Sequence, residues 1–184
     1  MAATRTRKIS VMGTRAVGKS SLTVQFVEEH FVESYYPTIE NQFSKTIKYR
    51  GHDYATEILD TAGQDEFSIM NSRYIIGVHG YVLVYSITSR PSFDMVRVIH
   101  DKILNSTGTD SMPMIIVGNK SDLGAQRKVT TEEGQALANE FHCQFIETSA
   151  RHNANIAKVF ELLIGEIEKV QNPQPESSDK CIIS

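Results

Sequence analysis

The segment from Gly13 to Ser20 most limits what this chain can fold into, because it fits the pattern G-x-x-x-x-G-K-[ST]. An apolar run at residues 8–13 precedes it, and an amphipathic helical pattern at 19–29 follows it. A glycine-rich loop between a strand and a helix can wrap its backbone N–H groups around phosphate oxygens, and the helix N-terminus adds positive charge. We therefore expect a nucleoside-phosphate site in which Lys19 contacts the β- and γ-phosphates and Ser20 binds Mg²⁺.

The rest of the chain alternates apolar segments with helical patterns, which is typical of an α/β fold with a mainly parallel sheet. The short turn at 50–52 joins two of the predicted strands, so this pair must be antiparallel. Strands are predicted at 8–13, 42–49, 53–59, 80–86, 112–118 and 144–147, and helices at 19–29, 93–103, 130–141 and 156–170. The expected fold is α/β, a six-stranded, mostly parallel sheet with one antiparallel edge strand and five helices on both faces.

Composition limits the class of protein. The chain has 184 residues, a net charge of −3 and 40% apolar residues, which suits one globular domain. The chain lacks the excess of basic residues that is typical of nucleic-acid-binding proteins. No apolar run approaches the roughly 20 residues that a membrane-spanning helix needs. Two cysteines, Cys143 and Cys181, cannot form a disulfide framework. We expect a cytoplasmic protein with a domain at 1–171 and a flexible tail at 172–184.

Asp60-Thr61-Ala62-Gly63 follows the third predicted strand. Asp60 could hold Mg²⁺ through water there, and Gly63 could bring a backbone N–H to the γ-phosphate. Read alone, a D-x-x-G segment is weak and is more often a helix cap or a turn. Its place after a strand, downstream of a phosphate loop, favours the metal site.

Asn119-Lys120-Ser121-Asp122 follows an apolar strand and is interpreted as a base-recognition segment. The carboxylate of Asp122 can accept hydrogen bonds from the adjacent N–H and amino groups of guanine, a pair that adenine lacks. A site built on a buried acid rejects the wrong base because the acid would be left unpaired. Thr148-Ser149-Ala150 follows the next strand and could complete the base pocket.

These segments, in this order, resemble the five signature motifs of the Ras superfamily of small GTPases over residues 7–171. The resemblance implies a Ras-like P-loop GTPase fold that binds GTP or GDP with Mg²⁺. It also implies that Thr38 binds Mg²⁺, that Gln64 orients the attacking water, and that 61–77 form a second switch. The expected Mg²⁺ ligands are Ser20, Thr38 and, through water, Asp60, and the expected catalytic residues are Gln64, Thr38 and Lys19. The expected nucleotide contacts are Arg15, Ala16, Val17, Gly18, Lys19, Ser20, Ser21, Val32, Tyr35, Thr38, Gly63, Asn119, Lys120, Asp122, Ser149 and Ala150.

Within the superfamily the sequence is most similar to the Rheb branch. Arg15 stands where Ras proteins have the second glycine of the phosphate loop, and Rheb proteins have an arginine there. The expected effector region is Tyr35, Tyr36, Pro37, Thr38, Ile39, Glu40, Asn41, Gln42 and Phe43, with Tyr36 in place of the usual acidic residue. The resemblance implies a monomeric switch whose GTP form activates growth signalling through the TOR kinase complex, and a tuberin-type GAP that inactivates it.

Hydrolysis should differ from that of Ras because Arg15 and Ala16 add side chains at the mouth of the loop. Arg15 could point inward as a built-in positive charge, or outward, where it would crowd an external arginine. The outward orientation is favoured, since an inward arginine meets the like charges of Lys19 and Mg²⁺ first. We expect slow hydrolysis, only mildly reduced by Gln64→Leu, and a GAP that supplies something other than an arginine finger.

The last four residues, Cys181-Ile182-Ile183-Ser184, form a C-a-a-X motif for farnesylation of Cys181. The alternative is an unmodified tail that ends in apolar residues by chance. No basic run precedes the motif, and one lipid chain binds membranes weakly. We expect attachment to the cytoplasmic face of endomembranes together with a soluble pool.

Three other functions remain open. A Ras-family switch could serve a different effector pathway. A P-loop nucleoside or nucleotide kinase would need an arginine-rich lid and an acceptor site, and neither is evident. A permanently loaded interaction module would tolerate a degenerate site, whereas Lys19, Ser20, Thr38, Asp60 and Gln64 are all intact.

Overall fold

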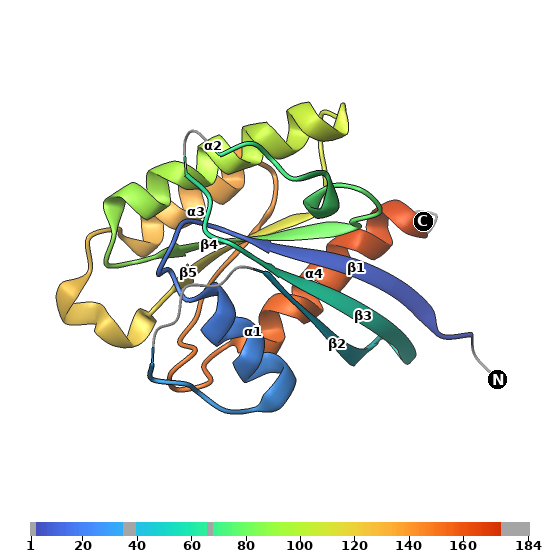
Figure 1. The fold of residues 1–184 in the computed structure, drawn as a ribbon, viewed down its shortest axis with the longest axis horizontal. Coiled ribbons are helices and arrows are strands. Elements are labelled where there is room, and N and C mark those ends of the chain that lie inside the picture. Colours follow the sequence, from blue (N-terminus) through green and yellow to red (C-terminus); the bar gives the residue numbers. More distant parts are fainter. Residues whose placement is uncertain (1–2, 35–39, 66–67, 174–184) are drawn as a thin grey trace, which may run out of the picture.

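The computed structural model describes residues 3–34, 40–65 and 68–173. A central sheet carries helices on both faces (Figure 1). The strands are β1 (Arg5–Met12), β2 (Glu40–Tyr49), β3 (His52–Thr61), β4 (Gly80–Ser86), β5 (Met114–Asn119) and β6 (Gln144–Glu147). The helices are α1 (Lys19–Glu28), α2 (Arg90–Thr107), α3 (Thr131–Glu140) and α4 (Ile156–Gln171), with short 3-10 helices η1 (Ser72–Tyr74) and η2 (Ser121–Gln126).

The sheet has the predicted six strands, mostly parallel with one antiparallel edge strand. Its order is β2-β3-β1-β4-β5-β6, and β2–β3 is the one antiparallel pair among the described strands. Val11 pairs with Asp60, and Ser86 pairs with Asn119. The carboxyl ends of the parallel strands therefore lie along one edge, which is where ligands bind in open α/β sheets.

The helices enclose a separate apolar core on each face of the sheet. On one face α1 and α4 pack together, and the ring of Phe26 stacks on that of Phe160 with centroids 4.0 Å apart. On the other face α2 and α3 cover residues such as Leu83 and Ile116. The α/β class is confirmed; five helices were predicted, and the described residues form four α-helices and two 3-10 helices.

Local sequence signals explain where several helices begin and end. Thr130 and Glu133 form a capping box at the start of α3, in which each side chain accepts a hydrogen bond from the other residue's backbone N–H. Ser89 caps α2, which ends at Gly108 in the left-handed conformation. The structure also corrects several limits: β1 begins at Arg5 rather than at residue 8, α2 spans Arg90–Thr107 rather than 93–103, and β5 begins at Met114 rather than at residue 112.

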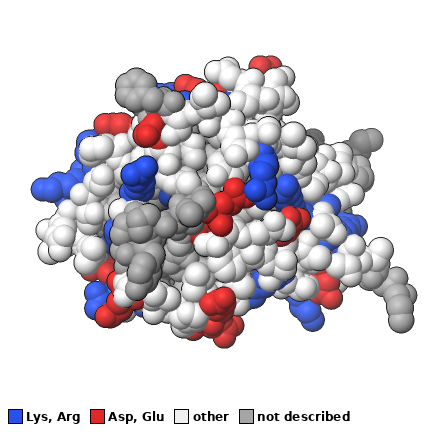
Figure 2. All heavy atoms as spheres, viewed as in Figure 1, with Lys and Arg blue, Asp and Glu red and all other residues white. Residues whose placement is uncertain are grey.

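Acidic and basic side chains are interspersed over the face shown in Figure 2. Cys143 lies half-buried beside β6, where burial is the main cause that raises the pKa of its thiol to about 12. Such a thiol is a packing group rather than a nucleophile. Within residues 3–34, 40–65 and 68–173, none of the helices has the length and apolar character needed to cross a bilayer.

Candidate nucleotide-binding site

The phosphate loop joins β1 to α1, as the pattern predicted. Gly18 caps α1 with a φ of 97°, a left-handed conformation that suits glycine. A Cβ on Gly18 would also overlap the side-chain amide of Asn119, so the loop and the Asn119 segment are in close contact. Gly63 allows a second close approach, because a Cβ there would lie 2.7 Å from the backbone nitrogen of Arg15.

Lys19 is buried inside the loop at 6% exposure, and its Nζ donates a hydrogen bond to the carbonyl of Thr14 at 2.7 Å. Burial lowers the pKa of Lys19 to about 8, although the nearby Asp60 carboxylate raises it in part. A bound anion would compensate the buried ammonium. This lysine is therefore suited to phosphate oxygens.

Ser20 and Asp60 meet at the end of β3. Ser20 Oγ donates to Asp60 Oδ2 at 2.6 Å, whereas Asp60 Oδ1 is buried without a hydrogen-bond partner among the described residues. Burial raises the pKa of Asp60, against the opposing effects of the Ser20 hydrogen bond and of Lys19. An unsatisfied carboxylate oxygen beside a hydroxyl fits hydrated Mg²⁺, which prefers oxygen ligands and keeps several waters.

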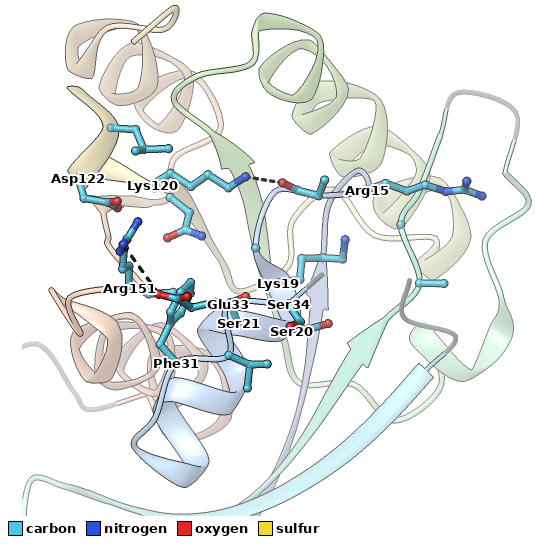
Figure 3. A pocket seen from close by; sticks show the side chains of 18 residues that line it. Arg15, Lys19, Ser20, Ser21, Phe31, Glu33, Ser34, Lys120, Asp122 and Arg151 are labelled. Carbon is cyan, nitrogen blue, oxygen red and sulfur yellow. Dashed lines mark hydrogen bonds and ion pairs between the residues drawn. The ribbon is translucent and has the colours of Figure 1, made fainter. Parts of the chain in front are cut away.

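Asn119 and Lys120 tie the base-recognition segment to the phosphate loop. Asn119 is 1% exposed; its Nδ2 donates to the carbonyl of Val17 at 3.0 Å, and its Oδ1 accepts from Thr148 Oγ1 at 3.0 Å. Lys120 Nζ donates to the carbonyl of Ala16 at 2.7 Å (Figure 3). Two side chains thus fix the distance between the two halves of the site.

Asp122 is oriented by the loop after β6. Ser149 Oγ donates to Asp122 Oδ1 at 2.8 Å. Gln25 of α1, which is 6% exposed, donates to the carbonyl of Ala150 at 2.8 Å and so attaches the same loop to α1. The predicted base-pocket residues are brought together, and Gln25 is a support that the sequence did not reveal.

A cavity of about 500 Å³ runs between the phosphate loop and Asp122 (Figure 3). Its lining includes twelve predicted contacts: Arg15, Ala16, Gly18, Lys19, Ser20, Ser21, Val32, Gly63, Asn119, Lys120, Asp122 and Ala150. Val17 is instead buried under the loop at 1% exposure. Ser149 does not line the cavity but donates its hydroxyl hydrogen bond to Asp122. Tyr35 and Thr38 lie outside the described residues.

Six lining residues were not predicted: Phe31, Glu33, Ser34, Ala62, Leu123 and Arg151. Arg151 and Glu33 approach each other across the cavity, with Nη2 and Oε1 3.9 Å apart (Figure 3). The one feature of the sequence that could have indicated Arg151 as a lining residue is its position directly after Ser149-Ala150. Phe31 and Glu33 follow α1 in an irregular segment, whose path no periodic pattern indicates.

Gln64 does not line this cavity. It lines a second cavity of about 400 Å³ with Thr14, Arg15, Asp65 and Met95. Its backbone N–H donates to the carbonyl of Gly13 at 2.9 Å, and its Nε2 donates to the carbonyl of Ala62 at 2.9 Å. At 6% exposure the residue is buried, outside the lining of the cavity that contains Lys19 and Ser20.

Arg15 is exposed, and its side chain points away from Lys19 (Figure 3). This is the orientation that the sequence argument favoured. Of the expected effector region, Glu40–Phe43 lie in β2, where Glu40 pairs with Arg73 of η1 at 3.2 Å. Residues 35–39 are outside the described part of the chain.

Comparison with known proteins agrees with this geometry. A sequence model described as the Ras family matches residues 8–169. The chain is 65% identical to the "GTP-binding protein rhb1" of Schizosaccharomyces pombe over 100% of both chains. It is 64% identical to the "Small monomeric GTPase RhbA" of Aspergillus fumigatus over 99% of this chain and 98% of that one. It is 46% identical to the human "GTP-binding protein Rheb" over 100% of both. The chain therefore belongs to the Ras family of small GTPases.

Proposed function

We propose that this chain is a membrane-attached guanine-nucleotide switch of the Rheb type. The observation that carries the proposal is the single cavity that has Lys19 and Ser20 at one end and Asp122 at the other. In its GTP form, residues near 34–43 and 61–77 would order around the γ-phosphate, and hydrolysis would release them.

Different residues in and around the cavity would bind the different parts of the nucleotide. Lys19 and the N–H groups of the loop would bind the phosphates, while Ser20, Asp60 and Thr38 would hold Mg²⁺. Mg²⁺ supplies positive charge that offsets the negative charge developing on the phosphate oxygens. Asp122 would accept the hydrogen bonds of guanine, in an orientation set by Ser149.

We propose that GTP hydrolysis is slow. Its support is the position of Gln64, which two hydrogen bonds hold outside the nucleotide cavity. The exposed Arg15 at the mouth of the loop would also hinder an arginine supplied from outside. A tuberin-type GAP that acts on this protein would then supply a group other than arginine.

The signalling role rests on similarity to Rheb-named proteins along the whole chain. We propose the TOR kinase complex as effector of the GTP form. Glu40–Phe43 of β2 support this, because they lie on an edge strand with Asn41 and Gln42 exposed. Farnesylation of Cys181 would provide the anchor at endomembranes, with a soluble pool because one lipid binds weakly.

The test is the nucleotide content and the GTP turnover of the purified protein, with and without a tuberin-type GAP. We expect bound guanine nucleotide and a slow turnover that the GAP accelerates. Protein that carries no guanine nucleotide, or that transfers phosphate to an acceptor such as a nucleoside monophosphate, would contradict the proposal.

A further inference from the structure

Lys102 of α2 reaches the backbone of the segment that follows Gln64. Its Nζ donates hydrogen bonds to the carbonyls of Asp65, at 3.0 Å, and Ser68, at 2.9 Å. The segment after β3 passes beside α2 in Figure 1, in agreement with these contacts. Hydrogen bonds from an ammonium group are stronger than those between neutral groups. One side chain of α2 therefore anchors two points of the expected second switch.

The two anchored residues are also bonded to each other. The backbone N–H of Ser68 donates to the carbonyl of Asp65 at 3.2 Å. The hydroxyl of Ser68 accepts from the N–H of Asp65 at 3.0 Å and donates to its carboxylate at 2.9 Å. Because Asp65 and Ser68 hold each other, Lys102 fixes them against α2 as a pair.

Gln64 lies directly before this anchored pair and is fixed from its other side by the phosphate loop. Its backbone N–H donates to the carbonyl of Gly13 at 2.9 Å. Met95, seven residues before Lys102 and so on the same face of α2, lines the second cavity together with Gln64. The backbone on both sides of Gln64 is thus held at a position from which its side chain bonds the Ala62 carbonyl. Moving the residue toward the phosphates requires one of these attachments to yield.

We propose that Lys102 is a positioning residue for GTP hydrolysis: by binding the carbonyls of Asp65 and Ser68, it keeps Gln64 turned away from the phosphates. The proposal rests on the proposed slow hydrolysis with little contribution from Gln64. It adds the reason for this small contribution, which is an attachment on α2 rather than the chemistry of the glutamine itself. Removing the ammonium releases the segment and lets Gln64 take part.

The test is a double-mutant cycle on the full chain loaded with GTP and Mg²⁺. Lys102→Met keeps the length of the side chain but removes its charge and its donors. Single-turnover hydrolysis is measured for the wild type, Lys102→Met, Gln64→Leu and the double variant. Gln64→Leu is expected to slow hydrolysis less than about threefold in the wild type and more than about tenfold in the Lys102→Met background.

Each outcome decides one claim. An effect of Gln64→Leu that grows by more than about twofold when Lys102 is replaced supports the positioning role. An effect that is small and equal in both backgrounds overturns this role and leaves the proposed slow hydrolysis intact. A loss of about a hundredfold from Gln64→Leu in the wild type overturns the proposed contribution of Gln64 itself, and with it the role of Lys102.

Backbone amide exchange at Gln64 gives a second readout that does not depend on turnover. In the GTP-loaded protein, Lys102→Met is expected to speed exchange of this amide by more than about threefold. Unchanged exchange would contradict the anchoring. Lys158→Met is the matched control, because Lys158 is exposed on α4 and pairs with Glu161 at 3.2 Å. Lys102→Gln serves as a second variant if Lys102→Met does not fold.

Discussion

At the scale of single residues, Asp122 decides which base the cavity accepts in the proposed function. Ser149 orients its carboxylate, which would accept from the N–H and amino groups of guanine. In Asp122→Asn an amide N–H would face the guanine amino group, so guanine nucleotides should bind at least about tenfold more weakly. Xanthine nucleotides should bind this variant more tightly than they bind the wild type, because their O2 can accept a hydrogen bond from that N–H.

Fluorescence titration with labelled GDP and XDP measures this exchange of specificity. Asp110→Asn provides the matched control, since Asp110 is exposed and does not line the cavity. Guanine affinity that is unchanged in Asp122→Asn would remove Asp122 from base recognition.

Lys19 gives the site a pH dependence. Burial holds the pKa of its ammonium at about 8 in the nucleotide-free site, so above this pH the free site loses the charge that phosphate requires. Bound phosphate would raise the pKa again, so the bound state holds more protons and binding weakens as pH rises. We expect the GDP affinity to fall about tenfold between pH 7 and pH 9, as the protonated fraction of the free site falls by that factor.

Equilibrium binding of GDP at the two pH values checks this expectation. Lys19→Met should bind weakly at both values and should lack the pH dependence. Lys158→Met, which removes an exposed lysine on α4, should retain it. A wild-type affinity that does not change with pH would show that Lys19 keeps its proton throughout this range.

The sequence predicted most of the cavity at this scale but not the position of Gln64. Gly18, Lys19 and Asn119 sit where their motifs predicted, because each motif fixes a turn directly after a strand. The orientation of Gln64 depends instead on Ala62, Gly13 and the neighbouring Lys102 contacts, and Lys102 is 38 positions further along the chain. Such long-range contacts leave no local pattern.

At the scale of elements, the ends of helices were predictable where a side chain caps them. The capping box of Thr130 and Glu133 is confirmed as the start of α3. The short helix η1 was not predicted, because three residues are too few for a period to show. Strand β1 extends beyond its apolar run because Arg5–Lys8 pair with β3 despite their charge, which composition alone does not indicate.

The cap of α3 offers a stability test at this scale. Thr130 Oγ1 accepts the backbone N–H of Glu133 at 3.1 Å, and Thr130→Ala removes that acceptor. We expect the free energy of unfolding to fall by about 1 kcal/mol, measured in urea at a fixed GDP concentration. Ser111→Ala, at an exposed position outside the helices, is the control. Equal stability of Thr130→Ala and the wild type would show that the cap contributes nothing.

At the scale of the whole molecule, nucleotide binding and the proposed anchor lie in different parts of the chain. The site is built from loops along one edge of the sheet, and the Ras-family match ends at residue 169. At the opposite end of β1, Arg5 and Arg7 pair with Glu168 of α4, at 3.0 and 2.8 Å. These ion pairs fix α4 to the sheet before residues 174–184, so changes in that segment should leave the nucleotide site intact.

Cys181→Ser therefore separates the two functions. It removes the sulfur that would carry the farnesyl group, so the protein should move fully to the soluble fraction of a cell lysate while GDP affinity stays at the wild-type value. The wild type should divide between membrane and soluble fractions, since one lipid without a basic run binds weakly. Cys143→Ser is the control, because the raised pKa of the half-buried Cys143 makes it a poor acceptor. A wild-type protein that is wholly soluble, with a distribution that Cys181→Ser does not change, would contradict the anchor.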